Sequence, residues 1–238
     1  MSNLSFEAEG RFLSLRGPYV NSLGTIEHPL VTKDLSDNRR KRDGPTAGYH
    51  ITVVNHLEIK SFLPDTELNE RGEEVQLSLS KKKKLFRKHQ MQLLKQVYEK
   101  FGNADHWEKP RDLGLGICKK DNAVSYYRVI FWPFGQEIRR FLGLPPCNFH
   151  ITVGFTPQDI HLYKGPGSLL CLQGISPCSN RELCTLIDFL PFYTEDFEFL
   201  KNLYWVCCKY RYYMAMGHLI KVTFKCRLTL ADVSLDFV

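Results

Sequence analysis

The chain carries one tetrapeptide twice, as His50-Ile51-Thr52-Val53 and again, unchanged, as His150-Ile151-Thr152-Val153. An aromatic residue precedes each copy, and each copy lies in an apolar, β-branched run typical of a buried strand. Side chains alternate between the two faces of a strand, so His and Thr share one face while Ile and Val point into a core. Each copy therefore presents one imidazole and one hydroxyl from a rigid backbone.

Two such strands side by side would place two imidazoles and two hydroxyls around one small volume. A neutral imidazole can take the proton of an attacking oxygen, and a protonated one can give a proton to a leaving oxygen, each transfer being worth about 10²–10⁴ in rate. The threonine hydroxyls can donate to non-bridging phosphate oxygens. The repeat therefore predicts a phosphodiester-cleaving site in which His50 and His150 are acid and base and Thr52 and Thr152 hold the phosphate.

Composition limits the classes of protein that the chain can represent. Its 238 residues are 43% apolar, which fits one large domain or a compact two-lobed one. The first ten residues are polar and acidic, and no window holds about 18 uninterrupted apolar residues, so we expect neither a signal peptide nor a membrane span. Eight cysteines without a CxxC pair argue against a zinc ribbon and for a reducing compartment, the cytoplasm or the nucleus.

The net charge of +6 is modest and favours a polyanionic partner only where it is clustered. One cluster, Arg39-Arg40-Lys41-Arg42, lies in a polar stretch, residues 33–46, that predicts an exposed loop. The other, residues 81–84, opens a helical pattern and is followed by Arg87 and Lys88. Each cluster fits an RNA-binding track, a solvated surface or a nuclear import signal. Carboxylate clusters of a two-metal nuclease are missing from the sequence, so we expect no metal and no cofactor.

Periodicity predicts a mixture of strands and helices. Strands are expected at residues 11–15, 49–54, 114–118, 124–131 and 149–155, with a further half-buried strand at 222–230. Helices are expected over 85–101 and 136–142, and parts of 181–210 are helical in pattern. The order of these elements predicts an α+β fold.

The two motifs resemble the H-x-[ST]-hydrophobic signature of the 2H phosphoesterase superfamily, also called LigT-like. Further runs resemble one branch of it, the Swiss Army Knife RNA repair-like domain: residues 48–53, 126–133, 135–136, 142–146 and 149–155. The resemblance covers roughly residues 10–165. It implies a bilobal fold in which two antiparallel sheets, backed by helices, face a central groove and supply one motif each. Residues 1–165 would form the phosphoesterase core, and 166–238 would complete the second lobe or form an added tail.

The resemblance also implies an activity. Superfamily members open 2′,3′-cyclic phosphates, process 2′–5′ linkages or trim RNA 3′ ends. For this chain it implies a metal-independent phosphodiesterase acting on RNA or on nucleotides with a cyclic phosphate, in RNA repair or processing, with His150 as base and His50 as acid by analogy. The chain is expected to be a monomer. The alternative is a non-catalytic nucleotide- or RNA-binding module with the same fold, but two intact His/Thr pairs favour the enzyme.

Other residues are weaker candidates for substrate contacts. Arg128 could grip a phosphate with two N–H groups, and Tyr49 and Phe155 could stack a base, although aromatic residues in strands more often belong to the core. His56 and His161 lie beyond the motifs and fit surface positions as well as substrate contacts. Cys147 precedes the second motif and could be taken for a nucleophile, an interpretation that the sequence supports poorly.

Overall fold

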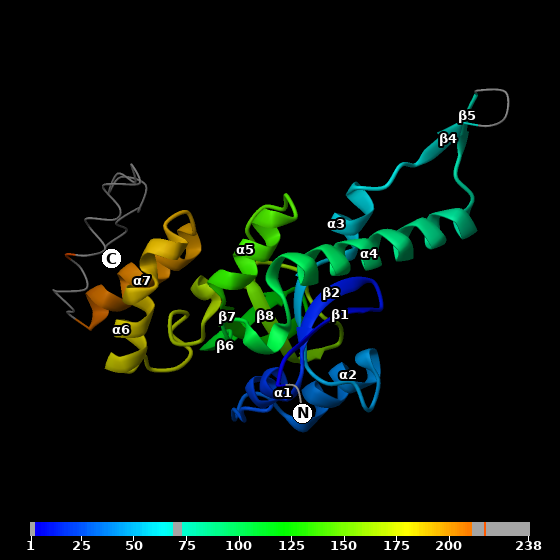
Figure 1. Cartoon of the computed structure of the whole chain (residues 1–238). Coiled ribbons are helices and arrows are strands. Elements are labelled where there is room, and N and C mark those ends of the chain that lie inside the picture. The colour runs from blue at the N-terminus through cyan, green and yellow to red at the C-terminus, as the bar shows by residue number, and fades with distance from the viewer. Residues whose placement is uncertain (1–2, 69–72, 211–216, 218–238) are drawn as a thin grey trace. The chain divides into compact units, whose positions relative to one another are not determined.

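The structure is a computed structural model that describes residues 3–68, 73–210 and 217 (Figure 1). Its contacts group the chain into two units. Unit 1 comprises segments Met1–Ile26, Pro45–Arg111 and Phe131–Ile151, and unit 2 comprises Glu27–Gly44, Asp112–Ile130 and Thr152–Val238. The mixture of helices and antiparallel sheets confirms the predicted α+β class. Within the described part of the chain, no helix is both long enough and apolar enough to cross a membrane.

Unit 1 contains a three-stranded antiparallel sheet of order β1-β2-β3 and a small hairpin, β4-β5. The strands are β1 (Ser5–Glu9), β2 (Phe12–Arg16), β3 (Ile51–Val54), β4 (Thr66–Leu68) and β5 (Glu74–Gln76). The helices are α1 (Pro18–Gly24), α3 (His56–Ser61), α4 (Leu79–Phe101), η1 (Ala104–His106) and α5 (Pro133–Phe141).

The long helix α4 covers the sheet of unit 1. Its buried Leu93 and Val97 recur at helical spacing, and the helix packs against β1 and β2. The Ser78 side chain caps its first turn by accepting from Lys81 N, and Gly102, with a φ of +70°, ends it. The predicted helix at 85–101 is therefore confirmed, with a start six residues earlier than its apolar periodicity indicated.

A second three-stranded sheet has the order β6-β7-β8. Its strands are β6 (Arg111–Lys120), β7 (Ala123–Phe131) and β8 (Phe149–Thr156), and β8 contributes residues to both units. A two-residue turn joins β6 to β7, with Asp121 at a φ of +52°. The helices of unit 2 are α2 (Lys33–Asp43), η2 (Pro166–Ser168), α6 (Asn180–Asp188), η3 (Leu190–Tyr193) and α7 (Phe197–Lys209).

The core of unit 2 joins the hairpin β6-β7 to the segment that follows the second motif. One buried cluster contains Tyr127 and Val129 of β7 together with Leu183 of α6 and Phe199 and Leu203 of α7. The predicted partial helicity of 181–210 is confirmed in this segment. The strand predicted at 222–230 lies outside the described residues.

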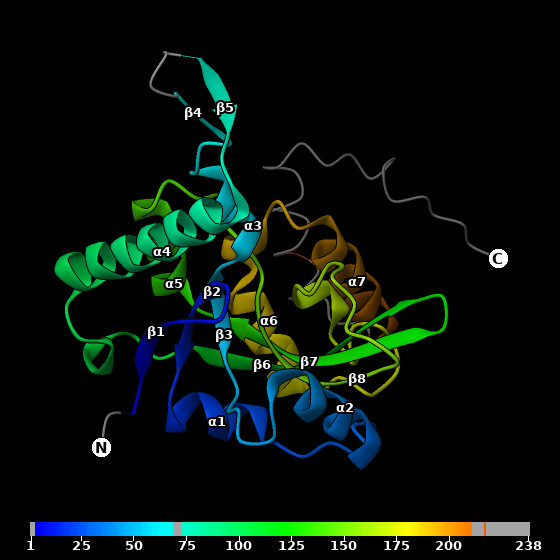
Figure 2. The same ribbon diagram turned by 90° about the vertical axis from the view of Figure 1, so that its right-hand side faces the viewer.

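The loop predicted over residues 33–46 is wrong, because residues 33–43 form the helix α2. Its sequence shows almost no apolar periodicity, and contacts with β8 stabilise it instead (Figure 2). Gly154 leaves room for Leu35, since a Cβ there would lie 2.9 Å from the Leu35 backbone, and the Asn38 amide donates to the Phe155 carbonyl at 3.0 Å. Tertiary packing has overridden local pattern here.

Candidate active site

The first motif lies at the start of β3 and shows the predicted alternation. Ile51 and Val53 are fully buried, whereas Thr52 is half-buried. His50, also half-buried, directly precedes the strand and stacks on the Phe12 ring, with ring centroids 5.0 Å apart and planes at 18°. In the sheet register, Thr52 lies opposite Ser14 of β2. The first motif therefore meets an aromatic face and a neutral hydroxyl residue.

The second motif lies within β8 and has the same alternation. Ile151 and Val153 are buried, and His150 and Thr152 are half-buried on the opposite face. The His150 Nδ1 atom lies 3.2 Å from the Asn148 carbonyl oxygen. Because a carbonyl can only accept, this contact places the proton on Nδ1, and neutral His150 carries its lone pair on Nε2.

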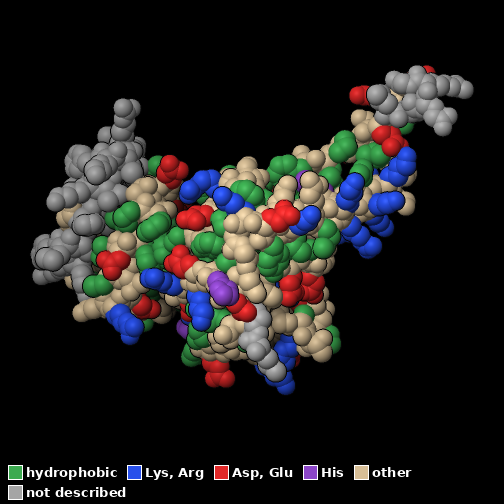
Figure 3. Space-filling view, viewed as in Figure 1, with side chains coloured by type: hydrophobic (Ala, Val, Ile, Leu, Met, Phe, Trp, Pro, Cys, Tyr) green, Lys and Arg blue, Asp and Glu red, His purple; other side chains and the backbone are tan. Residues whose placement is uncertain are grey.

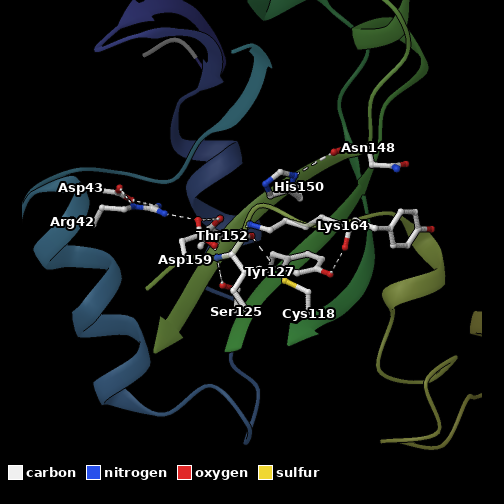
Figure 4. Close-up of polar contacts among 12 residues, drawn as sticks. Arg42, Asp43, Cys118, Ser125, Tyr127, Asn148, His150, Thr152, Asp159 and Lys164 are labelled. Carbon is white, nitrogen blue, oxygen red and sulfur yellow. Dashed lines mark hydrogen bonds and ion pairs between the residues drawn. The ribbon is translucent and has the colours of Figure 1, made fainter. Parts of the chain in front are cut away.

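A buried carboxylate, Asp159, gathers donors beside the second motif (Figure 4). Oδ1 accepts from Ser125 Oγ at 2.9 Å and from Lys164 Nζ at 3.0 Å. Oδ2 accepts from Arg42 Nη1 at 2.5 Å and lies 3.5 Å from Thr152 Oγ1. We refer to these five residues as the Asp159 cluster.

The Asp159 cluster holds its carboxylate in the ionised form. Burial alone would raise the pKa of Asp159, but the charges of Lys164 and Arg42 and the hydrogen bonds from Lys164 and Ser125 outweigh it and lower that pKa to about 2. The side chains of Asp159 and Lys164 are only 7% and 3% exposed. A fixed negative charge therefore stands next to the Thr152 hydroxyl over the whole physiological pH range.

Sequence reasoning did not find the Asp159 cluster. Arg42 is separated from Asp159 by 117 positions, and no spacing rule links them. Asp159 and Lys164 do follow the second motif closely, but isolated charges in a loop carry no recognisable pattern. The only available signal was their position just after a motif strand.

The three residues predicted to bind substrate have other contacts in this structure. The Arg128 guanidinium is buried and binds the Asp112 carboxylate through Nε, at 3.0 Å, and through Nη2. Phe155 is buried beneath the Arg42 guanidinium, 5.0 Å from the ring centroid. The Tyr49 ring packs over Gly24. These contacts favour pairing and core roles, and contact with substrate stays a prediction for all three.

Three further candidates, His56, His161 and Cys147, lie outside the two His-Ile-Thr-Val motifs. His56 is the first residue of α3, and His161 is exposed in the loop after β8. Burial raises the pKa of the Cys147 thiol to about 11, against the opposing charge of Arg139, so the thiol is poorly suited to nucleophilic attack. Among the described residues, no group of three or more His, Cys, Asp or Glu side chains is arranged to hold a metal ion.

The two basic clusters differ in how much of their charge is already paired. On α2, Arg39 contacts Asp43 at 3.6 Å, Arg40 contacts Asp37 at 3.2 Å, and Arg42 belongs to the Asp159 cluster. Three of the four cations in this cluster are thus engaged within the chain.

In the cluster on α4, by contrast, the first two lysines form ion pairs. Lys81 binds Glu67 at 2.6 Å and Lys82 binds Asp65 at 3.0 Å. The next four cations along the helix are exposed: Lys83, Lys84, Arg87 and Lys88. Figure 3 shows Lys and Arg side chains gathered over this N-terminal part of α4. The α4 cluster, defined as these four residues, is the stronger candidate for a polyanion contact.

In a comparison with protein-family models, residues 11–161 match the Swiss Army Knife 2H phosphoesterase domain. Searches of curated proteins and of solved structures give no significant match. The matched segment contains both His-Ile-Thr-Val motifs and Asp159, and it ends before Lys164.

Proposed function

Because the chain belongs to the Swiss Army Knife family of 2H phosphoesterase domains, we propose that it is a metal-independent phosphodiesterase that opens 2′,3′-cyclic phosphate ends of RNA or nucleotides. One observation carries the proposal. Two identical motifs each combine a half-buried His and a half-buried Thr with an Ile and a Val that are buried in a strand. We propose His50, Thr52, His150 and Thr152 as the catalytic residues.

The surroundings of the two histidines support different roles for them. Hydrogen bonding of Nδ1 to Asn148 leaves the lone pair of His150 on Nε2, which suits a general base. His50 stacks on the Phe12 ring instead, and we assign it the role of general acid by analogy with the family.

In the proposed reaction, the cyclic phosphate ring opens in a single displacement step at phosphorus. Water attacks phosphorus and passes one proton to Nε2 of His150, while the bond from phosphorus to one ribose oxygen breaks. His50 gives its proton to that oxygen, and Thr52 donates to a non-bridging oxygen of the phosphate. The products are a phosphate monoester and a free ribose hydroxyl.

The direct test uses the purified chain, a nucleoside 2′,3′-cyclic phosphate and excess EDTA. We expect turnover to survive chelation and its pH profile to be bell-shaped. His50→Ala and His150→Ala should each lower kcat/KM at least about 10²-fold, and the double variant should lose much less than the product of the two. His106→Ala, which removes an exposed imidazole from η1, is the matched control and should keep full activity.

A substrate with a better leaving group separates acid from base. On a p-nitrophenyl phosphodiester the leaving oxygen departs without a proton, so His50→Ala should recover most of its activity and His150→Ala should not. Full turnover by His150→Ala would refute the mechanism. Nucleotide binding without any wild-type turnover would instead assign the chain to the alternative class, a non-catalytic binding module.

We propose that the α4 cluster contacts the phosphates of an RNA substrate. Replacing Lys84 and Arg87 with alanine should weaken RNA binding and reduce the salt slope by about one unit for each phosphate that is no longer neutralised. Lys95→Ala on the same helix is the control, because Lys95 already lies 3.5 Å from Glu99. Equal slopes in the two proteins would show that the α4 cluster is only solvated surface.

A further inference from the structure

The two motifs are identical in sequence, but their threonines have different neighbours. Thr52 lies opposite Ser14, a neutral residue, in the sheet of unit 1. Thr152 lies 3.5 Å from the Asp159 carboxylate in unit 2. A carboxylate accepts hydrogen bonds and, when ionised, donates none. Across this long contact the Thr152 hydroxyl directs its proton toward Asp159.

This direction limits what Thr152 can do for a substrate. A hydroxyl has a single proton, so Thr152 cannot donate to Asp159 and to a phosphate oxygen at the same time. Its two lone pairs remain available to accept. We propose that Asp159 is a positioning residue that makes Thr152 a hydrogen-bond acceptor for the attacking water, and this inference rests on the proposed function.

The attacking water has two protons, and the second motif then supplies an acceptor for each. His150 Nε2 takes one proton during attack, and Thr152 Oγ1 accepts a hydrogen bond from the other. Both residues lie on the same face of β8, two positions apart. Holding both protons directs an oxygen lone pair of the water toward phosphorus. Thr152 therefore orients the nucleophile, whereas Thr52 binds the phosphate.

The rest of the Asp159 cluster keeps the carboxylate in place for this task. Lys164, Arg42 and Ser125 hold both of its oxygens, and the nearly complete burial of Asp159 and Lys164 limits their alternative positions. The Lys164 ammonium group also lies 5.2 Å from the Tyr127 ring centroid, a second contact that fixes it.

A double-mutant cycle on turnover tests the coupling. In the wild-type background, Thr152→Val should lower kcat for a nucleoside 2′,3′-cyclic phosphate about tenfold, because it removes one hydrogen bond used in the transition state. With Asp159→Asn already present, Thr152→Val should cost less than about twofold. Thr52→Val is the comparator and should cost the same in both backgrounds. Equal losses for Thr152→Val in the two backgrounds would overturn the inference.

Asp159→Asn leaves the buried Lys164 without its carboxylate partner and could destabilise the fold. A second background controls for this effect. The double replacement Asp159→Asn with Lys164→Met removes both charges together and avoids an uncompensated buried ion. The same cycle is measured in that background. Thr152→Ser, which keeps the hydroxyl, should retain most of the wild-type kcat, and a loss equal to that of Thr152→Val would also overturn the inference.

Thermal unfolding separates this inference from the proposed function. Thr152→Val should lower Tm more in the wild type than in the background that carries Asp159→Asn and Lys164→Met, whether or not the protein turns over a cyclic phosphate. That coupling without any wild-type turnover would refute the proposed function and leave the Thr152–Asp159 hydrogen bond established. Lack of coupling in both turnover and Tm would refute the positioning role itself.

Discussion

Arg139 on α5 binds acceptors from three other parts of unit 1, so replacing it with methionine should be costly. Nε donates to the Pro145 carbonyl at 2.7 Å, and Nη1 donates to the Val53 carbonyl at 2.5 Å. Nη2 lies 2.6 Å from Glu58 Oε1. Val53 directly follows the threonine of the first motif, and Pro145 lies in the approach to the second. One guanidinium thus holds backbone next to both motifs.

The cost of Arg139→Met follows from burial. The Arg139 side chain is 3% exposed and that of Glu58 is 20% exposed, so Glu58 regains part of its hydration when its partner is removed. The ion pair then contributes about 3 kcal/mol, the lower end for a buried pair broken on one side. Two carbonyls left without a donor cost about 1 kcal/mol each. Methionine retains much of the apolar stem, so we expect a loss of about 5 kcal/mol in the free energy of unfolding.

Thermal unfolding followed by circular dichroism measures this loss. In a protein of this size, 1 kcal/mol corresponds to about 2–4 °C, so Tm should fall by about 10–20 °C. Lys95→Met is the matched control, because Lys95 and Glu99 are 76% and 61% exposed, and it should shift Tm by less than about 4 °C. Turnover by Arg139→Met below its Tm should also fall, since β3 and the segment that leads into β8 each lose a hydrogen bond to Arg139. Similar Tm shifts in the two variants would refute this reasoning.

Three further outcomes are expected. First, the pKa of Asp159 in the folded protein lies below its ordinary value of 3.8, so the ionised carboxylate contributes about 2 kcal/mol to stability. This contribution is complete above about pH 4 and is lost as the pH falls toward 2. Urea unfolding measured across that pH range should show the loss in the wild type and a flatter pH dependence in Asp159→Asn. Second, Cys147→Ala should leave kcat/KM unchanged. The wild-type Cys147 thiol should resist iodoacetamide at neutral pH, because burial raises its pKa to about 11. Inactivation of the enzyme by alkylation of Cys147 would contradict the conclusion that this thiol takes no part in catalysis. Gly24→Ala should destabilise the protein by about 1–3 kcal/mol, measured by urea unfolding, because its Cβ would lie 2.2 Å from the Tyr49 ring; an unchanged midpoint would mean that the ring moves freely.

The sequence was a good guide wherever one residue pattern and one structural period coincide. Ile51, Val53, Ile151 and Val153 are buried as the alternation predicted, because a strand that covers a core has no other way to place them. The helix α4 was found for the same reason, since its Leu93 and Val97 repeat at helical spacing. The two candidate histidines could be singled out because a repeated motif is visible without any knowledge of contacts, and their catalytic role stays a prediction.

The sequence was a poor guide where contacts between distant residues decide the structure. The helix α2 has no apolar stripe of its own and is held by Gly154 and by the carbonyl of Phe155, which belong to a strand far along the chain. Asp159 was missed for a related reason, since its importance depends on which cations reach it in the fold. The repeated motif likewise gave no distinction between its two copies, because the difference lies in the neighbours Phe12 and Asp159.

In unit 2, the segment that matches the family model is shorter than the segment that packs into one core. The family match ends at residue 161, yet Tyr127 and Val129 inside it pack against Leu183, Phe199 and Leu203 beyond it. A fragment cut at the end of the match would therefore expose a broad apolar face of the hairpin β6-β7 to water and invite aggregation. A domain boundary for grafting or recombination should therefore be chosen from the packed core. It should lie after α7 and not at residue 161, where the homology ends.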